Sequence, residues 1–420
     1  MVSCFAIAVA AAWIGAGPRV EQAERIVFLG DSITYAGTFV QDVEAYLATR
    51  FPDRPRRVLN LGLPSETASG LSEKEHPWPR PTVHERLARA LDATHPDLVV
   101  ASYGMNDGIF HPFDEGRFAA FRSGMEGLHE QATRAGASVL IATPFPFDVR
   151  PTADKARPLG ADDYGYSHPY VDYDRTLGRY ARWLVGQKER GWAVADVHSP
   201  ASQAMASFAA LDPTYAMARD GIHPGPAGHW LIAESLLAAW GLPEEVDDAA
   251  IDAKAMAATQ GRVEGLANED GTIRFAWTTR VPMPHAAGWD RLPAGAPPRI
   301  DRFNRHRLAV AGLPDPRYVL MEDGRRIGEF DRAALAGGID LTALPDLSSN
   351  RRSAAIRPIL EVRSRMLAAA WLFAIGHKRP GVAPGLPLEE AQEKAEAMDR
   401  EIRRLAHPVP IRLELRPVAR

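Results

Sequence analysis

The sequence predicts an α/β protein with two parts: a three-layer α/β/α sandwich around a parallel sheet, then a β-rich module with a helical hairpin. In the first half of the chain, short apolar runs alternate with helical patterns, which is typical of a parallel sheet covered on both faces. Residues 260–345 change to short apolar runs separated by turn residues such as Asp323 and Gly324. Two long helical patterns follow, over 353–375 and 385–406.

Five strands and five helices are expected in the first half. The strands are expected near 25–30, 56–60, 97–102, 137–143 and 192–196, and the helices near 37–50, 80–93, 114–135, 170–190 and 226–240. Two connections, 64–81 and 144–169, are long for a compact domain. Both leave the carboxyl edge of the sheet, where open α/β sheets bind ligands. Their aromatic residues therefore either wall a binding site or pack the loops onto the body.

A domain boundary is predicted where Gly241-Leu242-Pro243 precedes an acidic stretch. The chain then divides into residues 1–20, a catalytic domain over 21–245 and a C-terminal region over 246–420. In that region the two helices are expected to form an αα-hairpin. The alternating run Ile411–Leu415 is expected to return as a strand to the β-rich unit.

Composition excludes several classes of function. The chain has 420 residues and a net charge of −4, which gives no electrostatic footprint for nucleic acid. Its single cysteine, Cys4, excludes an intrachain disulfide and a thiolate metal cluster. There is no Gly-Lys dipeptide for a phosphate-binding P-loop, no zincin motif and no G-x-S-x-G elbow. We therefore expect no cofactor, no metal and no stable membrane insertion.

The first residues resemble part of an export signal. Met1–Gly17 is mostly apolar and small and ends in a small-residue region, as in the core and cleavage site of a secretory signal. A positive region ahead of it is missing. The prediction is export to the periplasm or exterior, and the alternative is a disordered N-terminus on a cytoplasmic protein.

A candidate nucleophile follows the first expected strand. Ile26–Leu29 is a short apolar run, and Gly30-Asp31-Ser32 follows it directly. A serine at a strand-to-helix turn has its hydroxyl at the carboxyl edge of the sheet and backbone N–H groups beside it. Taken alone, the same serine would more often be a helix cap.

Three further motifs favour a catalytic role for this serine over a role as a helix cap. Asn60-Leu61-Gly62 and Gly104-Met105-Asn106-Asp107 each follow an expected strand, and Asp220-Gly221-Ile222-His223 precedes the last helix of the first half. In this order the four motifs resemble the SGNH (GDSL-type) hydrolase family over about residues 25–242. The longer runs around residues 62–67 and 103–108 are similar to bacterial members with a long C-terminal extension.

The resemblance assigns roles and a flavodoxin-like sheet. It implies Ser32 as nucleophile, His223 as base and Asp220 as the acid that orients the base. Three residues apart on a tight turn, Asp220 is also close enough to accept the Nδ1–H bond of His223. The resemblance further implies an oxyanion hole made by the Ser32 and Gly62 backbone N–H groups and the Asn106 side chain.

Asp31 and Asp107 are expected to hold loops rather than to react. Together these features predict a serine esterase that removes small acyl groups, acetyl above all, from carbohydrate through an acyl-Ser32 intermediate. The alternatives are an O-acyltransferase or lipid/aryl esterase on the same fold, and a non-catalytic carbohydrate-binding protein. The partner is an acylated small molecule or polysaccharide.

Residues 246–420 are open to two interpretations. They could be a binding module, or a scaffold that covers the catalytic domain or builds a homo-oligomer through the C-terminal helices. Amphipathic helices usually bury one face, which favours the scaffold.

Overall fold

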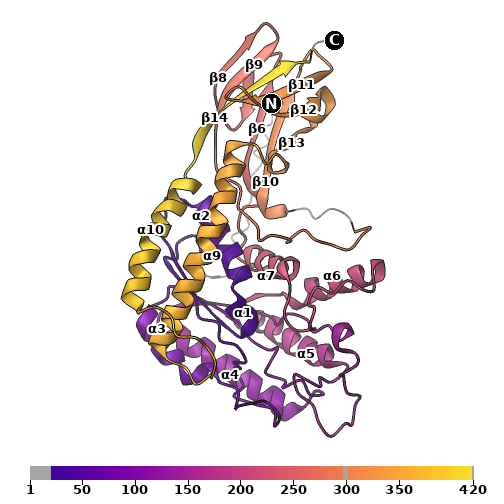
Figure 1. Cartoon of the computed structure of the whole chain (residues 1–420), viewed down its shortest axis with the longest axis vertical. Helices are drawn as coiled ribbons and strands as arrows, with labels where there is room; N and C mark the ends of the chain where they lie inside the picture. The colour runs from indigo at the N-terminus through magenta and orange to yellow at the C-terminus, as the bar shows by residue number, and fades with distance from the viewer. Residues whose placement is uncertain (1–19, 297–300, 419–420) are drawn as a thin grey trace, which may run out of the picture.

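The first half of the chain forms a five-stranded parallel sheet in the order β2-β1-β3-β4-β5 (Figure 1). The computed structural model describes residues 20–296 and 301–418, so the apolar segment 1–17 lies outside the described residues. The strands of the sheet are β1 (Arg25–Gly30), β2 (Arg57–Asn60), β3 (Leu98–Ser102), β4 (Ser138–Ala142) and β5 (Ala193–Ala195). The predicted α/β class is confirmed.

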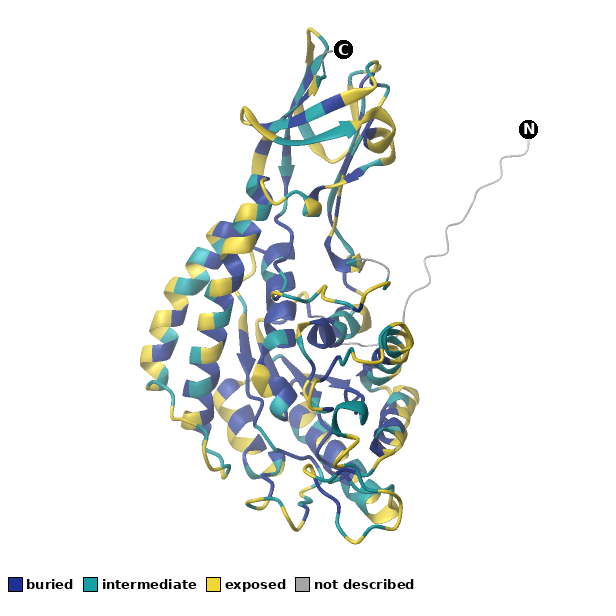
Figure 2. Ribbon diagram, turned by 45° about the vertical axis from the view of Figure 1, so that its right-hand side comes forward, coloured by how far each residue is buried: buried dark blue, intermediate teal, exposed yellow. Residues whose placement is uncertain are grey.

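Helices cover both faces of this sheet. They are α1 (Ser32–Ala36), α2 (Thr38–Arg50), α3 (Leu87–Thr94), α4 (Glu115–Arg134), α5 (Tyr173–Gly186), α6 (His198–Leu211) and α7 (Pro226–Ala239). Successive strand residues point to opposite faces. Phe28 therefore packs with α2, α6 and α7, whereas Leu29 packs with α3, α4 and α5. Figure 2 shows the strands buried beneath helices whose outer faces are exposed.

The structure contains two helices, α1 and α6, that were not predicted from the sequence. Helix α1 is a single turn of five residues, too short to show a hydrophobic period. Helix α6 is rich in alanine and serine and buries only Ala201 and Met205, so it has no apolar stripe to recognise. The predicted helix over 80–93 begins later, at Leu87, because an isolated bridge at Thr82 and a 3₁₀ turn precede it.

The C-terminal half contains two further sheets. The first has the order β13-β10-β6-β7 and the second β12-β11-β14-β9-β8. Their strands are β6 (Glu245–Asp252), β7 (Ala257–Gln260), β8 (Arg262–Glu269), β9 (Thr272–Thr279), β10 (Arg305–Ala311), β11 (Arg317–Glu322), β12 (Arg325–Asp331), β13 (Ile339–Asp340) and β14 (Val409–Pro417); α8 (Arg332–Gly337) lies between β12 and β13. The last strand, β14, inserts between β9 and β11, which confirms the predicted return of the chain.

The predicted helical hairpin is α9 (Ser348–Ile375) with α10 (Leu388–Ala406). It runs from the β-rich unit down the side of the catalytic sheet, where α9 contacts α2, α3 and β2 (Figure 1). Its apolar residues, such as Trp371, join the core cluster that also contains α3 and α4. One face of the hairpin thus covers the edge of the sheet, as a scaffold would.

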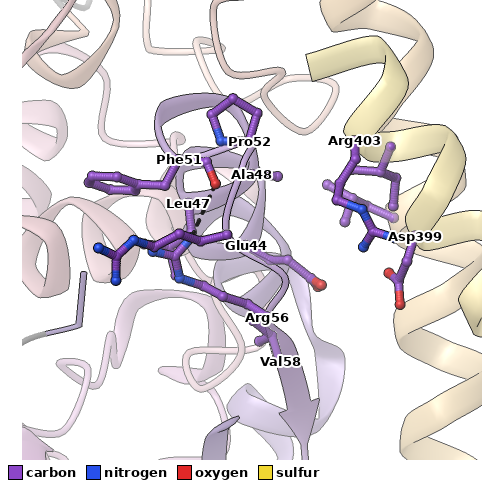
Figure 3. Close-up of a pocket in the computed structure, with 12 residues that line it drawn as sticks. Glu44, Leu47, Ala48, Phe51, Pro52, Arg56, Val58, Asp399 and Arg403 are labelled. Atoms are coloured by element: carbon purple, nitrogen blue, oxygen red, sulfur yellow. Dashed lines mark hydrogen bonds between the residues drawn. The ribbon is translucent and has the colours of Figure 1, made fainter. Parts of the chain in front are cut away.

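Buried ion pairs fix the hairpin on α2. Arg363 on α9 is 1% exposed and pairs with Glu44 of α2 at 2.7 Å and with Asp399 of α10. Figure 3 shows Glu44 facing Asp399 and Arg403 across a narrow cavity between α2 and α10. A buried charge that loses its partner is strongly destabilising, so these pairs determine where the hairpin packs on α2. Among the described residues, no helix is long and apolar enough to cross a membrane.

Candidate active site

The candidate nucleophile lies where β1 gives way to α1. Ser32 is the first residue of α1, and the buried Asp31 caps the helix by accepting a hydrogen bond from the Ile33 N–H at 2.9 Å. Glycine is required at position 30, because a Cβ there would lie 2.1 Å from Thr34 Oγ1. The tight turn leaves the side chain of Ser32 half-buried at the carboxyl edge of the sheet.

A second turn brings His223 to this serine from 191 residues away. His223 Nε2 lies 2.7 Å from Ser32 Oγ. Asp220 Oδ2 lies 2.6 Å from His223 Nδ1, while its Oδ1 accepts the backbone N–H groups of Ile222 and His223 at 3.0 and 2.8 Å. Gly221 allows this turn because its φ is +78°. The structure thus brings together Ser32, Asp220 and His223.

Asp220, His223 and Ser32 form a row of hydrogen-bonded side chains. The charges of this row favour one tautomer of the histidine. A carboxylate can only accept, so His223 Nδ1 carries the proton and Nε2 is left to accept from the serine hydroxyl. Burial opposes ionisation of Asp220, but hydrogen bonds from His223 and the backbone outweigh it and hold its pKa well below the usual value. The hydrogen bond to Asp220 raises the pKa of His223, and this effect outweighs burial, which lowers it. A hydroxyl, a base and an orienting acid in this geometry can perform nucleophilic catalysis.

The assignment of Gly62 to the oxyanion hole needs correction. Its backbone N–H donates to Asn60 Oδ1 at 2.9 Å, and Gly62 is buried and does not line the hollow that contains Ser32. A Cβ at this position would lie 2.3 Å from the Tyr35 backbone nitrogen, so glycine is needed for the close approach of α1. Its function in the fold is therefore packing, and its N–H is already engaged.

Ser65, three residues further on, offers the donor that Gly62 does not. Its φ is +67°, a left-handed conformation that is rare for a residue other than glycine. Its N–H has no hydrogen-bond acceptor among the described residues, and the residue lines the same hollow as Ser32. Arg80 Nη1 donates to the Ser65 carbonyl at 3.4 Å. The sequence offered no sign of this donor, because a left-handed serine looks like any loop serine.

Asn106 points its amide to the same place. It lines the hollow with Ser32, and its Nδ2 donates to the Glu66 carbonyl at 3.1 Å, which leaves the second N–H of the amide for another acceptor. Asp107 holds the loop beneath by accepting the Ala68 and Ser69 N–H groups at 2.8 and 2.7 Å. Burial raises the pKa of Asp107 to about 6. Asp31 and Asp107 thus hold loops, as expected.

A buried ion pair supports the loop that carries Ser65. Arg86 Nε donates to Glu66 Oε1 at 2.7 Å, and the Tyr103 hydroxyl donates to Glu66 Oε2 at 2.7 Å. Arg86 Nη2 also donates to the Leu61 carbonyl at 2.6 Å. All three side chains are buried, so the peptide between Leu61 and Glu66 is fixed from below.

The row opens into a hollow of about 280 Å³. The connection over 64–81 supplies much of its wall, including Trp78. From the connection over 144–169 only Tyr166 lines the hollow among the described residues, whereas Phe145, Phe147 and Tyr164 are buried, so each of the two interpretations holds for part of these loops. Thirteen residues line the hollow: Ser32, Pro64, Ser65, His76, Pro77, Trp78, Arg80, Asn106, Phe110, Tyr166, Ile222, His223 and Arg379.

One other group of ligating side chains was found among the described residues. Single atoms of Glu75, Asp163 and His168 lie within 4.8 Å of one another. Both carboxylates are exposed, and such groups are common without an ion, so we assign no metal to them.

Comparison with known proteins identifies the catalytic half. Residues 28–231 match the model of the GDSL-like Lipase/Acylhydrolase family. The chain therefore contains a GDSL-like domain over these residues and is a serine ester hydrolase. A search of the curated proteins found no match.

Solved structures are similar to this chain to different extents. BT4096, a gut microbial diltiazem-metabolizing enzyme, is 19% identical with a TM-score of 0.73, and the match covers 94% of this chain and 98% of that one. The fold of the C-terminal half is therefore also found outside this chain. Axe2, an acetylxylan esterase from Geobacillus stearothermophilus, is 20% identical with a TM-score of 0.39, covering 52% of this chain and 94% of its own. A putative acylhydrolase from Bacteroides fragilis is 17% identical with a TM-score of 0.34, over 52% and 86%.

Proposed function

We propose that this protein hydrolyses esters of short acyl groups, acetyl above all, through an acyl-Ser32 intermediate. The observation that carries the proposal is the continuous row from Asp220 through His223 to Ser32, with contacts of 2.6 and 2.7 Å. Family membership supplies the reaction class, and the row supplies the residues. The chemistry requires no group beyond the side chains and backbone of this site.

The first half of the reaction forms the acyl-enzyme. Ser32 Oγ attacks the ester carbonyl carbon while His223 Nε2 takes the hydroxyl proton. The carbonyl oxygen becomes an oxyanion that accepts hydrogen bonds from the Ser32 and Ser65 N–H groups and from Asn106 Nδ2. The C–O bond to the alcohol then breaks, and the alcohol leaves with the proton from His223.

The second half releases the acid. Water attacks the acyl carbon and gives a proton to His223 Nε2, and the same donors bind the new oxyanion. Collapse breaks the bond to Ser32, whose Oγ regains the proton. Asp220 stays ionised throughout, because its lowered pKa keeps it a carboxylate, and it stabilises the imidazolium form of His223.

The walls of the hollow support carbohydrate as the alcohol part. Trp78 and Tyr166 present aromatic rings beside polar side chains, a combination that suits a sugar ring with its apolar faces and hydroxyl edges. A volume of about 280 Å³ is at the lower end for ligand pockets, which favours a short acyl chain.

Hydrolysis of p-nitrophenyl esters from acetyl to octanoyl tests the acyl preference. We expect kcat/KM to fall steeply beyond acetyl, because the hollow has little room for a longer chain. Acetylated polysaccharides are then the next substrates, with released acetate as the readout. A preference for octanoyl would contradict the short-acyl proposal and favour a lipid esterase. A folded protein that is inactive on every ester but transfers acetyl to an added sugar would favour the acyltransferase.

Activity is expected to fall in acid with a midpoint above pH 6.5. His223 must be neutral to accept the serine proton, and its raised pKa keeps it protonated to a higher pH than a free histidine. The pH profile of kcat/KM for p-nitrophenyl acetate measures this midpoint. Asp220→Asn should move it to lower pH, since the hydrogen bond to Asp220 is the main cause of the shift. Asp31→Asn should move it less, and a wild-type midpoint below 6.5 would contradict the assignment.

Removal of the Asn106 donor is expected to lower kcat by about 10²–10³-fold. An oxyanion donor acts mainly in the transition state, so Asn106→Ala should change kcat far more than KM. Asn268→Ala is the control, because the Asn268 side chain accepts a turn N–H in the β8–β9 hairpin and lies outside the hollow. A loss below tenfold would remove Asn106 from the oxyanion hole.

A further inference from the structure

One residue of the hollow comes from the C-terminal half of the chain. Arg379 lies in the connection between α9 and α10, and it lines the hollow together with Ser32 and His223. Its guanidinium carbon lies over the ring of Trp78, 5.3 Å from the ring centroid. The rings continue from Trp78 to His76 and Tyr166, with centroid separations of 5.3 and 5.6 Å. Arg379 therefore forms one end of an aromatic wall.

The connection that carries Arg379 is fixed to the catalytic domain. Arg89 of α3 donates to the carbonyls of Ile375 and Gly376 at 2.8 and 3.2 Å. Lys378 pairs with Glu85 at 3.0 Å. These contacts hold the start of the connection beside the hollow. The position of Arg379 therefore depends on how the hairpin packs on the catalytic domain.

Arg379 is the charge in the hollow that lacks a counterion. Arg80 forms two hydrogen bonds with the buried carboxylate of Glu73, at 2.5 and 2.6 Å, and His223 is paired with Asp220. Arg379 has no carboxylate partner among the described residues; its one hydrogen bond there runs from Nη1 to the Pro380 carbonyl at 2.7 Å. Its Nε is buried without an acceptor. No aspartate or glutamate within 20–296 or 301–418 lines the hollow.

We propose that Arg379 binds a negatively charged group, a carboxylate in the first place, on the alcohol part of the ester. This inference rests on the proposed function, in which the acetyl group is neutral, so the charge must belong to the alcohol. The Arg379 side chain is partly buried at the wall of the hollow, and a guanidinium without a counterion binds carboxylate and phosphate through charge-assisted hydrogen bonds. The substrate class is then an acetylated acidic sugar, and the C-terminal half completes the binding site.

Matched esters test this proposal in the full-length protein. 4-Acetoxybenzoate carries a carboxylate, and 4-acetoxybenzamide is its neutral counterpart of similar shape. The measured quantity is the ratio of kcat/KM for the anionic ester to that for the neutral one. Arg379→Gln should lower the ratio at least about tenfold, and Arg379→Lys should retain most of it. Arg400→Gln removes the same charge on the exposed face of α10, outside the hollow, and should leave the ratio unchanged.

Binding to the Ser32→Ala variant separates this proposal from the proposed hydrolysis. Calorimetry should show tighter binding of the benzoate than of the benzamide, and Arg379→Gln in the same background should abolish the difference. That result would support the anion site even if the wild type hydrolysed neither ester. A ratio that Arg379→Gln leaves unchanged, or a hollow that binds neither compound, would overturn the proposal. Stronger binding of 4-acetoxyphenyl phosphate than of the benzoate would assign the site to phosphorylated alcohols.

Discussion

Ser32→Ala is expected to lower kcat for p-nitrophenyl acetate by about 10⁴-fold or more. The side chain supplies the atom that attacks the ester, and no neighbouring hydroxyl contacts His223 Nε2 in the described part of the chain. The fold should be unaffected, because Ser32 Oγ makes its one hydrogen bond with His223 and the cap of α1 belongs to Asp31.

The measurement compares initial rates, with circular dichroism and thermal unfolding as checks on the fold. Ser235→Ala is the matched control, since Ser235 Oγ donates to the Leu231 carbonyl within α7, away from the hollow. A burst of p-nitrophenol in the wild type, absent from the variant, would show the acyl-enzyme directly. Turnover in Ser32→Ala above about one part in a hundred would exclude the serine mechanism.

His223→Ala is expected to reduce kcat about as strongly as Ser32→Ala, and Asp220→Asn less. Without His223 no group takes the serine proton, so the hydroxyl remains a weak nucleophile. Asp220 orients the ring and stabilises its charged form but does not touch the reacting atoms. Asparagine keeps the Oδ1 acceptor for the Ile222 and His223 N–H groups, so the turn should survive while the charge is lost.

The kinetics of both variants on one substrate decide the role of the acid. Asp212→Asn provides the control, because Asp212 also accepts turn N–H and hydroxyl groups through Oδ1 but lies outside the hollow. Equal losses in Asp220→Asn and His223→Ala would mean that the acid does more than orient the base. Loss of the cooperative unfolding transition in Asp220→Asn would assign its effect to the turn instead.

Much of the fold was readable from local patterns. The strand around Phe28 and the pair Asp220 and His223 depend on short-range periodicity or on a turn of four residues, and both are encoded within a few positions. Helix α6 was missed because alanine-rich helices without an apolar stripe carry no such period.

The α9–α10 hairpin depends both on local sequence patterns and on contacts between residues far apart in the chain. Its helices were predicted from their sequence, whereas their seat on α2 depends on Arg363 meeting Glu44 and Asp399. Those partners are 319 and 36 residues away in the chain. No local pattern records which of many charges will be buried together.

The sequence by itself determined the class of the sheet, the identity of the nucleophile candidate and the acid–base pair, because each is written in a short motif beside a regular element. Only the tertiary structure decided which backbone N–H groups are already engaged and which distant residue lines the hollow. Asn60 occupies the Gly62 N–H and the chain turns left-handed at residue 65, so Ser65 takes the place of Gly62 in the oxyanion hole that we propose. Arg379 reaches Trp78 because the hairpin folds back along the sheet, a path set by packing across the whole chain.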